Sequence, residues 1–166
     1  TRVCTSIAII CVSWFLWMQT FFTGKCIFST AWKGANPLAN RESINEEWVM
    51  SRRNVNHGLS PLQTILESIG NPQNTYRCIH VAGTNGKGST CNYLKDILVS
   101  QGYKVGMFTS PHLMTHRDRI RINDSYISED AFHAYLMKYY DVIEEKQLGM
   151  FEIDTLIAFQ WFFDEK

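Results

Sequence analysis

The sequence has no excess of basic over acidic side chains, and this absence argues against one class of partner. Its 166 residues include 16 Lys and Arg and 16 Asp and Glu, so the formal net charge is zero. Four basic residues and one acidic residue lie in the first 45 positions, and twelve basic and fifteen acidic residues follow. A mildly acidic body without a basic stripe is not a surface that attracts nucleic acids. We therefore expect no nucleic-acid partner.

The sequence also lacks a Cys-x-x-Cys pair. The number of cysteines is odd, at Cys4, Cys11, Cys26, Cys78 and Cys91. This spacing fits neither a disulfide framework nor a common zinc site, and it favours a reducing compartment. We expect a cytoplasmic protein, with an organellar or membrane-tethered protein as the alternative if the apolar N-terminal segment is native.

Charged side chains are missing from Val3 to Phe22. About 20 apolar helical residues can span a bilayer, so a membrane contact is possible through Ile7–Phe22. A non-native leader and a buried core element are the other two interpretations, and the start at Thr1 rather than Met suggests an incomplete or misassigned beginning. The pattern divides the chain into an apolar leader with a polar linker, residues 1–45, and a partial domain, residues 46–166.

After the linker, helical and strand patterns alternate. Ser60-Pro61 is a typical helix start, and Ser128 is a candidate N-cap for a later helix. This order predicts an α/β fold with a parallel sheet, whose ligands bind at the carboxyl ends of the strands. The predicted segments are helices at 60–69, 89–102, 128–140 and 151–166, strands at 76–82 and 104–110, and an edge strand or hairpin arm at 118–124.

A glycine-rich loop connects the first strand of the body to the next helix. Three glycines allow consecutive backbone N–H groups to face one anion, and the helix N-terminus adds a favourable dipole. Lys87 supplies a full positive charge, and Ser89 or Thr90 offers a hydroxyl to Mg²⁺. The sequence therefore predicts a phosphate site, although the spacing is not the common Walker one. We call these residues the glycine loop: Gly83, Thr84, Asn85, Gly86, Lys87, Gly88, Ser89 and Thr90.

The block HVAGTNGKGST resembles the phosphate loop of the Mur ligase superfamily. Within it, VGMFTSPHLMTHRDRIRIND, NHGLSPLQTILESIGNP and MFEIDTLIAF are similar in order and spacing to the folylpolyglutamate synthase and dihydrofolate synthase branch. The resemblance covers about three-quarters of the chain. It implies an incomplete P-loop-type parallel sheet with flanking helices, the N-terminal part of a Mur-ligase-like ATP-binding domain.

The resemblance also implies a reaction, in which ATP activates a carboxylate of folate or dihydropteroate as an acyl phosphate and L-glutamate displaces the phosphate. Lys87 would be the catalytic residue and the glycine loop would hold ATP, with Ser89 and Ser110 beside Mg²⁺. A second set would bind the substrate: Gly58, Leu59, His112, Phe151 and Glu152. His112 is equally compatible with a structural role, Phe151 with core packing and Glu152 with a helix N-terminal charge.

Arg119 follows the second strand of the body in Asp118-Arg119-Ile120, where the family usually has Glu-Arg-Ile. The positive charge is compatible with support of an anionic substrate, but we favour a solvated hairpin. His80 is interpreted as a packed strand residue.

The family continues beyond the segment that corresponds to residues 151–166, so we expect this chain to be a fragment that binds ATP poorly and has no turnover alone. The sequence leaves two other functions open: a Mur-type cell-wall amino-acid ligase and a non-catalytic, truncated nucleotide-binding module. The oligomeric state is not predicted.

Overall fold

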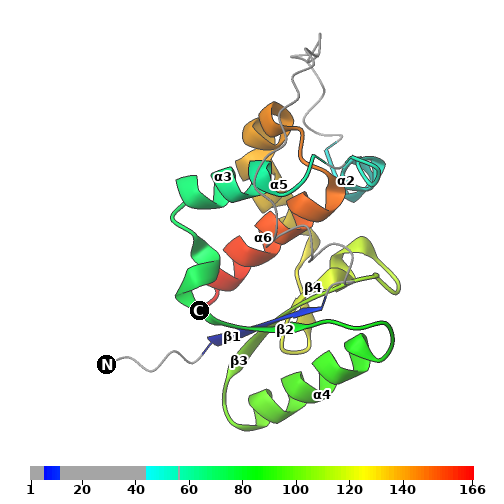
Figure 1. Ribbon diagram of the computed structural model, residues 1–166, viewed down its shortest axis with the longest axis vertical. Helices are drawn as coiled ribbons and strands as arrows, with labels where there is room; N and C mark the ends of the chain where they lie inside the picture. Colours follow the sequence, from blue (N-terminus) through cyan, green and yellow to red (C-terminus); the bar gives the residue numbers. More distant parts are fainter. Residues whose placement is uncertain (1–5, 12–43, 56) are drawn as a thin grey trace.

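A computed structural model describes residues 6–11, 44–55 and 57–166, and a five-stranded sheet lies at its centre (Figure 1). The strand order is β2 (Arg77–Val81), β1 (Ser6–Cys11), β3 (Lys104–Thr109), β4 (Ile120–Ile122) and β5 (Ser125–Tyr126). β1 runs parallel to β2 and β3, whereas β4 is antiparallel to β3 and to β5. The sheet is therefore mixed: the predicted parallel pairing holds for β2, β1 and β3, and the predicted hairpin arm at 118–124 is confirmed as the antiparallel β4. The physical reason is that the segment between β3 and β4, which is described throughout, contains no crossover helix, so the chain returns beside β3 in the opposite direction. A tight turn at Asn123, with a φ of 52°, reverses the chain again between β4 and β5.

The central strand comes from the apolar leader. In β1, Ile9 is level with Ile79 of β2 on one side and with Met107 of β3 on the other. Residues 6–11 thus pack inside the domain that we predicted to begin at residue 46, as the buried-element interpretation requires. The rest of Ile7–Phe22, beyond Cys11, lies outside the described residues. Within the described ranges, no helix is long and apolar enough to cross a bilayer.

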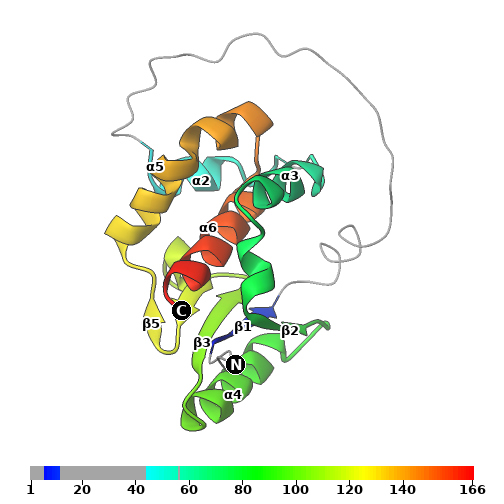
Figure 2. The same ribbon diagram turned by 90° about the vertical axis from the view of Figure 1, so that its left-hand side faces the viewer.

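Helices cover both faces of the sheet (Figure 2). α4 (Lys87–Ser100) lies on one face, and α6 (Met150–Asp164) crosses the other. Successive residues of β3 pack against opposite helix layers, because successive side chains of a strand point to opposite faces of the sheet. Met107 is buried with Cys91 of α4, whereas Phe108 belongs to the larger core around α6.

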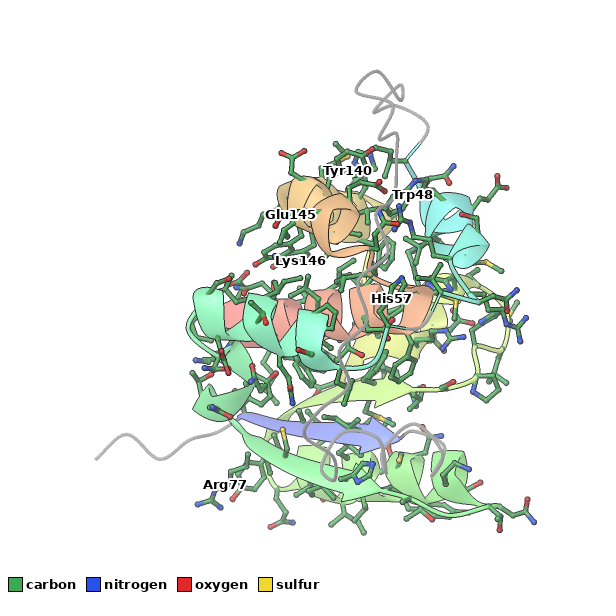
Figure 3. The ribbon with its side chains drawn as sticks, turned by 45° about the horizontal axis from the view of Figure 1, so that its top comes forward. Trp48, His57, Arg77, Tyr140, Glu145 and Lys146 are labelled. Carbon is green, nitrogen blue, oxygen red and sulfur yellow. The ribbon has the colours of Figure 1, made fainter. Side chains whose placement is uncertain are left out.

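Three further helices lie on the α6 side of the sheet: α2 (Glu46–Ser51), α3 (Ser60–Ser68) and α5 (Glu129–Lys146). Trp48 of α2 and Tyr140 of α5 lie side by side in Figure 3, with ring centroids 5.7 Å apart. The guanidinium of Arg52 lies 4.2 Å from the Trp48 ring centroid and pairs with Glu144 of α5. These contacts fix the N-terminal helix against the rest of the domain.

The helix starts follow local sequence closely. The Ser128 side chain accepts a hydrogen bond from the Ala131 N–H, as predicted for an N-cap. α3 begins at Ser60, as the range predicted for it does, with Leu59 at the N-cap and no side-chain hydrogen bond there. Two short 3₁₀ helices, η2 (Pro72–Thr75) and η3 (His116–Arg119), complete the described elements.

Candidate functional site

The glycine loop joins the carboxyl end of β2 to the first turn of α4. Gly86 is the N-cap of α4 and has a φ of +76°, a conformation that favours glycine because a Cβ would clash with the backbone. α4 begins at Lys87, so the N-terminal end of its dipole faces the loop. All of the loop residues except the partly buried Lys87 are exposed. The predicted loop therefore has the strand–turn–helix context that phosphate binding requires.

Lys87 is held over the loop by two backbone contacts. Its ammonium group donates to the carbonyl oxygen of Gly83 at 2.7 Å and to that of Thr84 at 3.0 Å. The Thr90 hydroxyl donates to the Gly86 carbonyl at 3.0 Å, so that hydroxyl is used within the helix. Lys87 is thus the positive charge of the loop, and Ser89 carries the remaining hydroxyl near the start of α4.

The second part of the site follows β3. Val81 of β2 and Thr109 of β3 are both level with Cys11 of β1, so the two strands leave the sheet at the same edge. Neighbouring strands lie about 4.8 Å apart, which puts the two strand ends about 10 Å from each other. The structure therefore brings Ser110 and His112 to the edge of the sheet that carries the glycine loop.

Arg119 is buried behind Ser110 and His112, and the expectation of a solvated hairpin was wrong for this residue. Arg119 is 5% exposed. Two of its guanidinium nitrogens lie 3.2 Å from the Ser110 Oγ and 3.2 Å from the His112 Nδ1. The physical reason is a carboxylate on α6, Asp154, whose Oδ2 lies 3.8 Å from the Arg119 Nε. Burial and the neighbouring Arg119 charge lower the pKa of His112.

The loop that carries these residues is held by Asp118. Its carboxylate accepts hydrogen bonds from the backbone N–H groups of Met114 at 2.8 Å and Thr115 at 2.9 Å. The Thr115 hydroxyl donates to the same carboxylate at 2.7 Å. At the start of η3, Thr115 and Asp118 also form a capping box, in which each side chain accepts from the backbone N–H of the other residue. The Asp118 side chain therefore fixes the turn from which Arg119 reaches Ser110.

The predicted substrate residues lie around the start of α6 and before α3. Phe151 packs on Phe108 of β3, with ring centroids 5.4 Å apart. Glu152 is 7% exposed, and its carboxylate accepts hydrogen bonds at the N-terminal end of α6 from its own N–H and from the Gly149 N–H. Gly58 and Leu59 precede α3 and are partly buried, and the neighbouring His57 lies beside α6 in Figure 3. Contact of these residues with a substrate remains a prediction.

Sequence reasoning missed His116 and Asp154, which form the most buried polar pair of the described chain. The His116 Nε2 lies 2.7 Å from the Asp154 Oδ1, and the two side chains are 1% and 0% exposed. Burial raises the pKa of Asp154. An aspartate in the otherwise apolar IDTLIAF segment was the available signal, because a charged residue at a core position needs a partner.

The metal prediction is less well supported. No group of three or more His, Cys, Asp and Glu side chains is arranged as a metal site within the described residues. Ser89 and Ser110 contribute neutral hydroxyl groups, and the Ser110 hydroxyl already contacts the Arg119 cation. Mg²⁺ is usually bound by one or two carboxylates together with substrate phosphates. The donors described here fit a phosphate better than a divalent cation.

No protein-family model matches the chain, but individual proteins do. The chain is 40% identical over 109 residues to dihydrofolate synthetase of Saccharomyces cerevisiae, covering 64% of this chain and 26% of that protein. It is 37% identical over 123 residues to dihydrofolate synthase/folylpolyglutamate synthase of Bacillus subtilis, covering 69% and 29%. The chain therefore spans about a quarter to a third of the length of these relatives.

Solved structures show the same similarity. Folylpolyglutamate synthase of Thermotoga maritima matches with a TM-score of 0.64 and 39% identity, over 72% of this chain and 30% of that one. A bifunctional folylpolyglutamate synthase/dihydrofolate synthase with bound Mn, AMPPNP and L-glutamate matches with a TM-score of 0.65 and 31% identity, over 72% and 29%. Both show an α/β fold that corresponds to the mixed sheet and flanking helices described here.

Proposed function

Because the chain belongs to the folylpolyglutamate synthase/dihydrofolate synthase family, we propose that it forms part of the ATP-binding domain of a ligase that joins L-glutamate to a folate-type carboxylate. The observation that carries this proposal is the shared edge of the sheet. The glycine loop with Lys87 follows β2, and the segment with Ser110 and His112 follows β3. At that edge the ends of these two strands are separated by β1. One group of residues would hold ATP, and the other would face the acceptor.

The proposed chemistry at the glycine loop is neutralisation and orientation of phosphate. Backbone N–H groups at the start of α4 donate to phosphate oxygens, and the ammonium of Lys87 exchanges its two carbonyl contacts for the outer phosphates. Holding the γ-phosphate in line with the attacking carboxylate is most of what a protein contributes to such a transfer. Lys87 is therefore the residue to which we assign catalysis.

Mg²⁺ would neutralise phosphate charge when bound, and Ser89 and Ser110 are the residues of this chain that we propose beside it. Two hydroxyl groups alone are a weak ligand set for this ion.

The proposed folate site lies where α6 begins. The Phe151 ring offers an apolar face and the Glu152 carboxylate accepts hydrogen bonds, which suits a flat heterocycle with N–H donors. Gly58, Leu59 and His112 complete the proposed lining. L-glutamate is the proposed amine substrate.

A second function is a nucleotide-binding module without catalysis. It is favoured by the contact of the Ser110 hydroxyl, a proposed metal donor, with the guanidinium of Arg119. We expect the 166-residue chain to bind ATP weakly and to form no product alone. Incubation of a longer protein that contains this segment with ATP and L-glutamate plus tetrahydrofolate, dihydropteroate or a UDP-muramyl peptide distinguishes the functions. Turnover with a folate would exclude the non-catalytic module, and turnover with only the muramyl substrate would favour a cell-wall ligase.

The nucleotide site is tested by Lys87→Met in the full chain. Because a charge-assisted contact contributes about 1.5–3 kcal/mol, the variant should bind ATP about 10- to 100-fold more weakly. Lys146→Met is the matched control, since Lys146 lies at the end of α5 and pairs with Glu145. Isothermal titration with ATP measures both. Equal affinities of the two variants would contradict the proposal that the glycine loop binds nucleotide.

A further inference from the structure

A buried polar cluster lies behind Ser110 and His112, and it consists of Asp154 on α6 with His116 and Arg119 on η3. The side chains of Asp154, His116 and Arg119 are 0%, 1% and 6% exposed. The reaction proposed above uses none of the three. Two rings enclose His116, with centroids at 5.9 Å for His112 and 6.0 Å for Phe132.

The contacts form a connected series from α6 to the sheet edge. His116 and Asp154 meet at 2.7 Å, and the second oxygen of Asp154 lies 3.8 Å from the Arg119 Nε. The other two guanidinium nitrogens face Ser110 and His112, at 3.2 Å each. The Arg119 Nε and the Asp154 Oδ2 make no hydrogen bond, so the attraction between them is electrostatic. A guanidinium is planar and rigid, so a carboxylate that attracts its Nε side also orients its two terminal nitrogens.

The direction of these hydrogen bonds follows from the chemistry of arginine. A guanidinium can only donate, so the Nδ1 of His112 must accept. The proton of a neutral His112 is then on Nε2, which makes that nitrogen a donor on the side away from Arg119. The Ser110 Oγ likewise accepts from Arg119.

We infer that Asp154 and His116 are positioning residues: they hold Arg119, and Arg119 sets the orientation of Ser110 and the tautomer of His112. His116 donates from Nε2 to one Asp154 oxygen and leaves the other to face the guanidinium. The relevance of this arrangement to catalysis rests on the proposed function, because Ser110 and His112 are the residues expected at the phosphate and substrate edge.

A purely stabilising role is a weaker explanation. Burying a carboxylate and its partner costs desolvation, and apolar residues in place of a buried ion pair are often neutral or stabilising. A pair kept only for packing would be replaceable without any effect on His112. A positioning pair would not.

The test separates these two roles in the full chain without any ligand. The double variant His116→Leu/Asp154→Leu fills the cluster with apolar side chains, so the fold should persist. Long-range ¹H–¹⁵N spectra of the histidine rings, recorded at one alkaline pH where imidazoles are neutral, report the tautomer. The His112 signals are identified from their loss in His112→Gln. We expect wild type to show His112 with its proton on Nε2, and the folded double variant to show mixed tautomers.

Retention of the Nε2–H tautomer in a folded double variant would overturn the inference. If the double variant does not fold, Asp154→Asn and Arg119→Met take its place. An asparagine at the first position lacks the charge that holds Arg119, and a methionine at the second has no N–H group to donate to the His112 Nδ1. Both should release His112 to mixed tautomers, and an unchanged His112 in either would also refute the inference. Because no nucleotide or folate is present, a failure of the ligase proposal leaves this result unaffected.

Discussion

At the residue scale, Glu152 has an ionisable side chain that is almost completely buried. Desolvation raises the pKa of its carboxyl, although its own N–H, the Gly149 N–H and the charge of His57 act in the opposite direction. A carboxyl in this position is easier to protonate in the folded chain than in the unfolded chain. The same residue is a proposed folate contact, so its protonation matters for binding as well as for stability.

This shift gives a pH dependence with a definite sign. Between the ordinary glutamate pKa and the raised folded value, the folded chain binds more protons than the unfolded chain at this residue. The contribution of Glu152 to stability therefore falls as the pH rises through that window. Glu152→Gln cannot ionise, so the free energy of unfolding of the variant relative to wild type should increase with pH there. Urea unfolding at several pH values measures this difference, and a flat or falling difference would contradict the assignment.

Gly149 gives a second prediction at this scale. A Cβ built there would lie 2.1 Å from the Val55 carbonyl oxygen, which is backbone and cannot move aside as a side chain can. Gly149→Ala should therefore lower the free energy of unfolding by about 3 kcal/mol. Gly88→Ala is the control, because nothing lies within 4 Å of its Cβ and it is inside α4. Alanine there should stabilise by about 0.4–1 kcal/mol. Similar urea midpoints for the two variants would rule out the close approach at Val55.

At the element scale, α6 packs unusually close to β3. A Cβ on Gly106 would lie 2.8 Å from the Phe162 ring. No residue larger than glycine therefore fits at this strand position unless the Phe162 ring moves. Gly106→Ala should cost about 1–3 kcal/mol. The effect should shrink in a Phe162→Leu background, where the smaller side chain leaves space. A double-mutant cycle by chemical denaturation measures the coupling, expected at about 0.5–3 kcal/mol, and strictly additive effects would contradict the contact.

Local signals were sufficient for the helices but not for what the helices bury. The Ser128 cap and the apolar period after it predicted α5, because a cap and a 3.6-residue period are properties of neighbouring residues. The burial of apolar residues along α4 does not follow from the predicted helix alone: Ile97 lies within the predicted range and is 59% exposed. A single helix on one face of a narrow sheet buries only the residues that point directly at the strands, and the sequence does not show where the sheet ends.

The candidate site shows the same division. The glycine loop was recognisable because its residues are consecutive and lie between a strand and a helix. The burial of Arg119 was not, because it depends on Asp154 from a helix much later in the chain. A pattern within RDRIRIND cannot distinguish a solvated arginine from one paired across the fold.

At the scale of the whole molecule, β1 completes the sheet between β2 and β3. Ile9 lies at its centre and is 0% exposed. Ile9→Ala should cost about 2–5 kcal/mol, because it leaves a cavity between two strands and α4. Ile97→Ala removes the same atoms from the exposed side of α4 and should change stability by no more than about 0.5 kcal/mol. Thermal or urea unfolding of both variants checks this, and a small loss for Ile9→Ala would mean that β1 is not the central strand.

The position of β1 also has a consequence for the order of events during synthesis. Ile7 pairs with Arg77, so the strand near the start of this chain waits for its first partner, β2, until about 70 residues later. At about 5–20 residues per second, that wait lasts about 4–14 s, and β3 follows later still. Until β2 has been synthesised, the apolar segment SIAIIC has no native strand neighbour and is open to association with other unfolded chains. Yield from a translating ribosome should therefore depend more on chaperones that shield this segment than on the stability of the finished sheet.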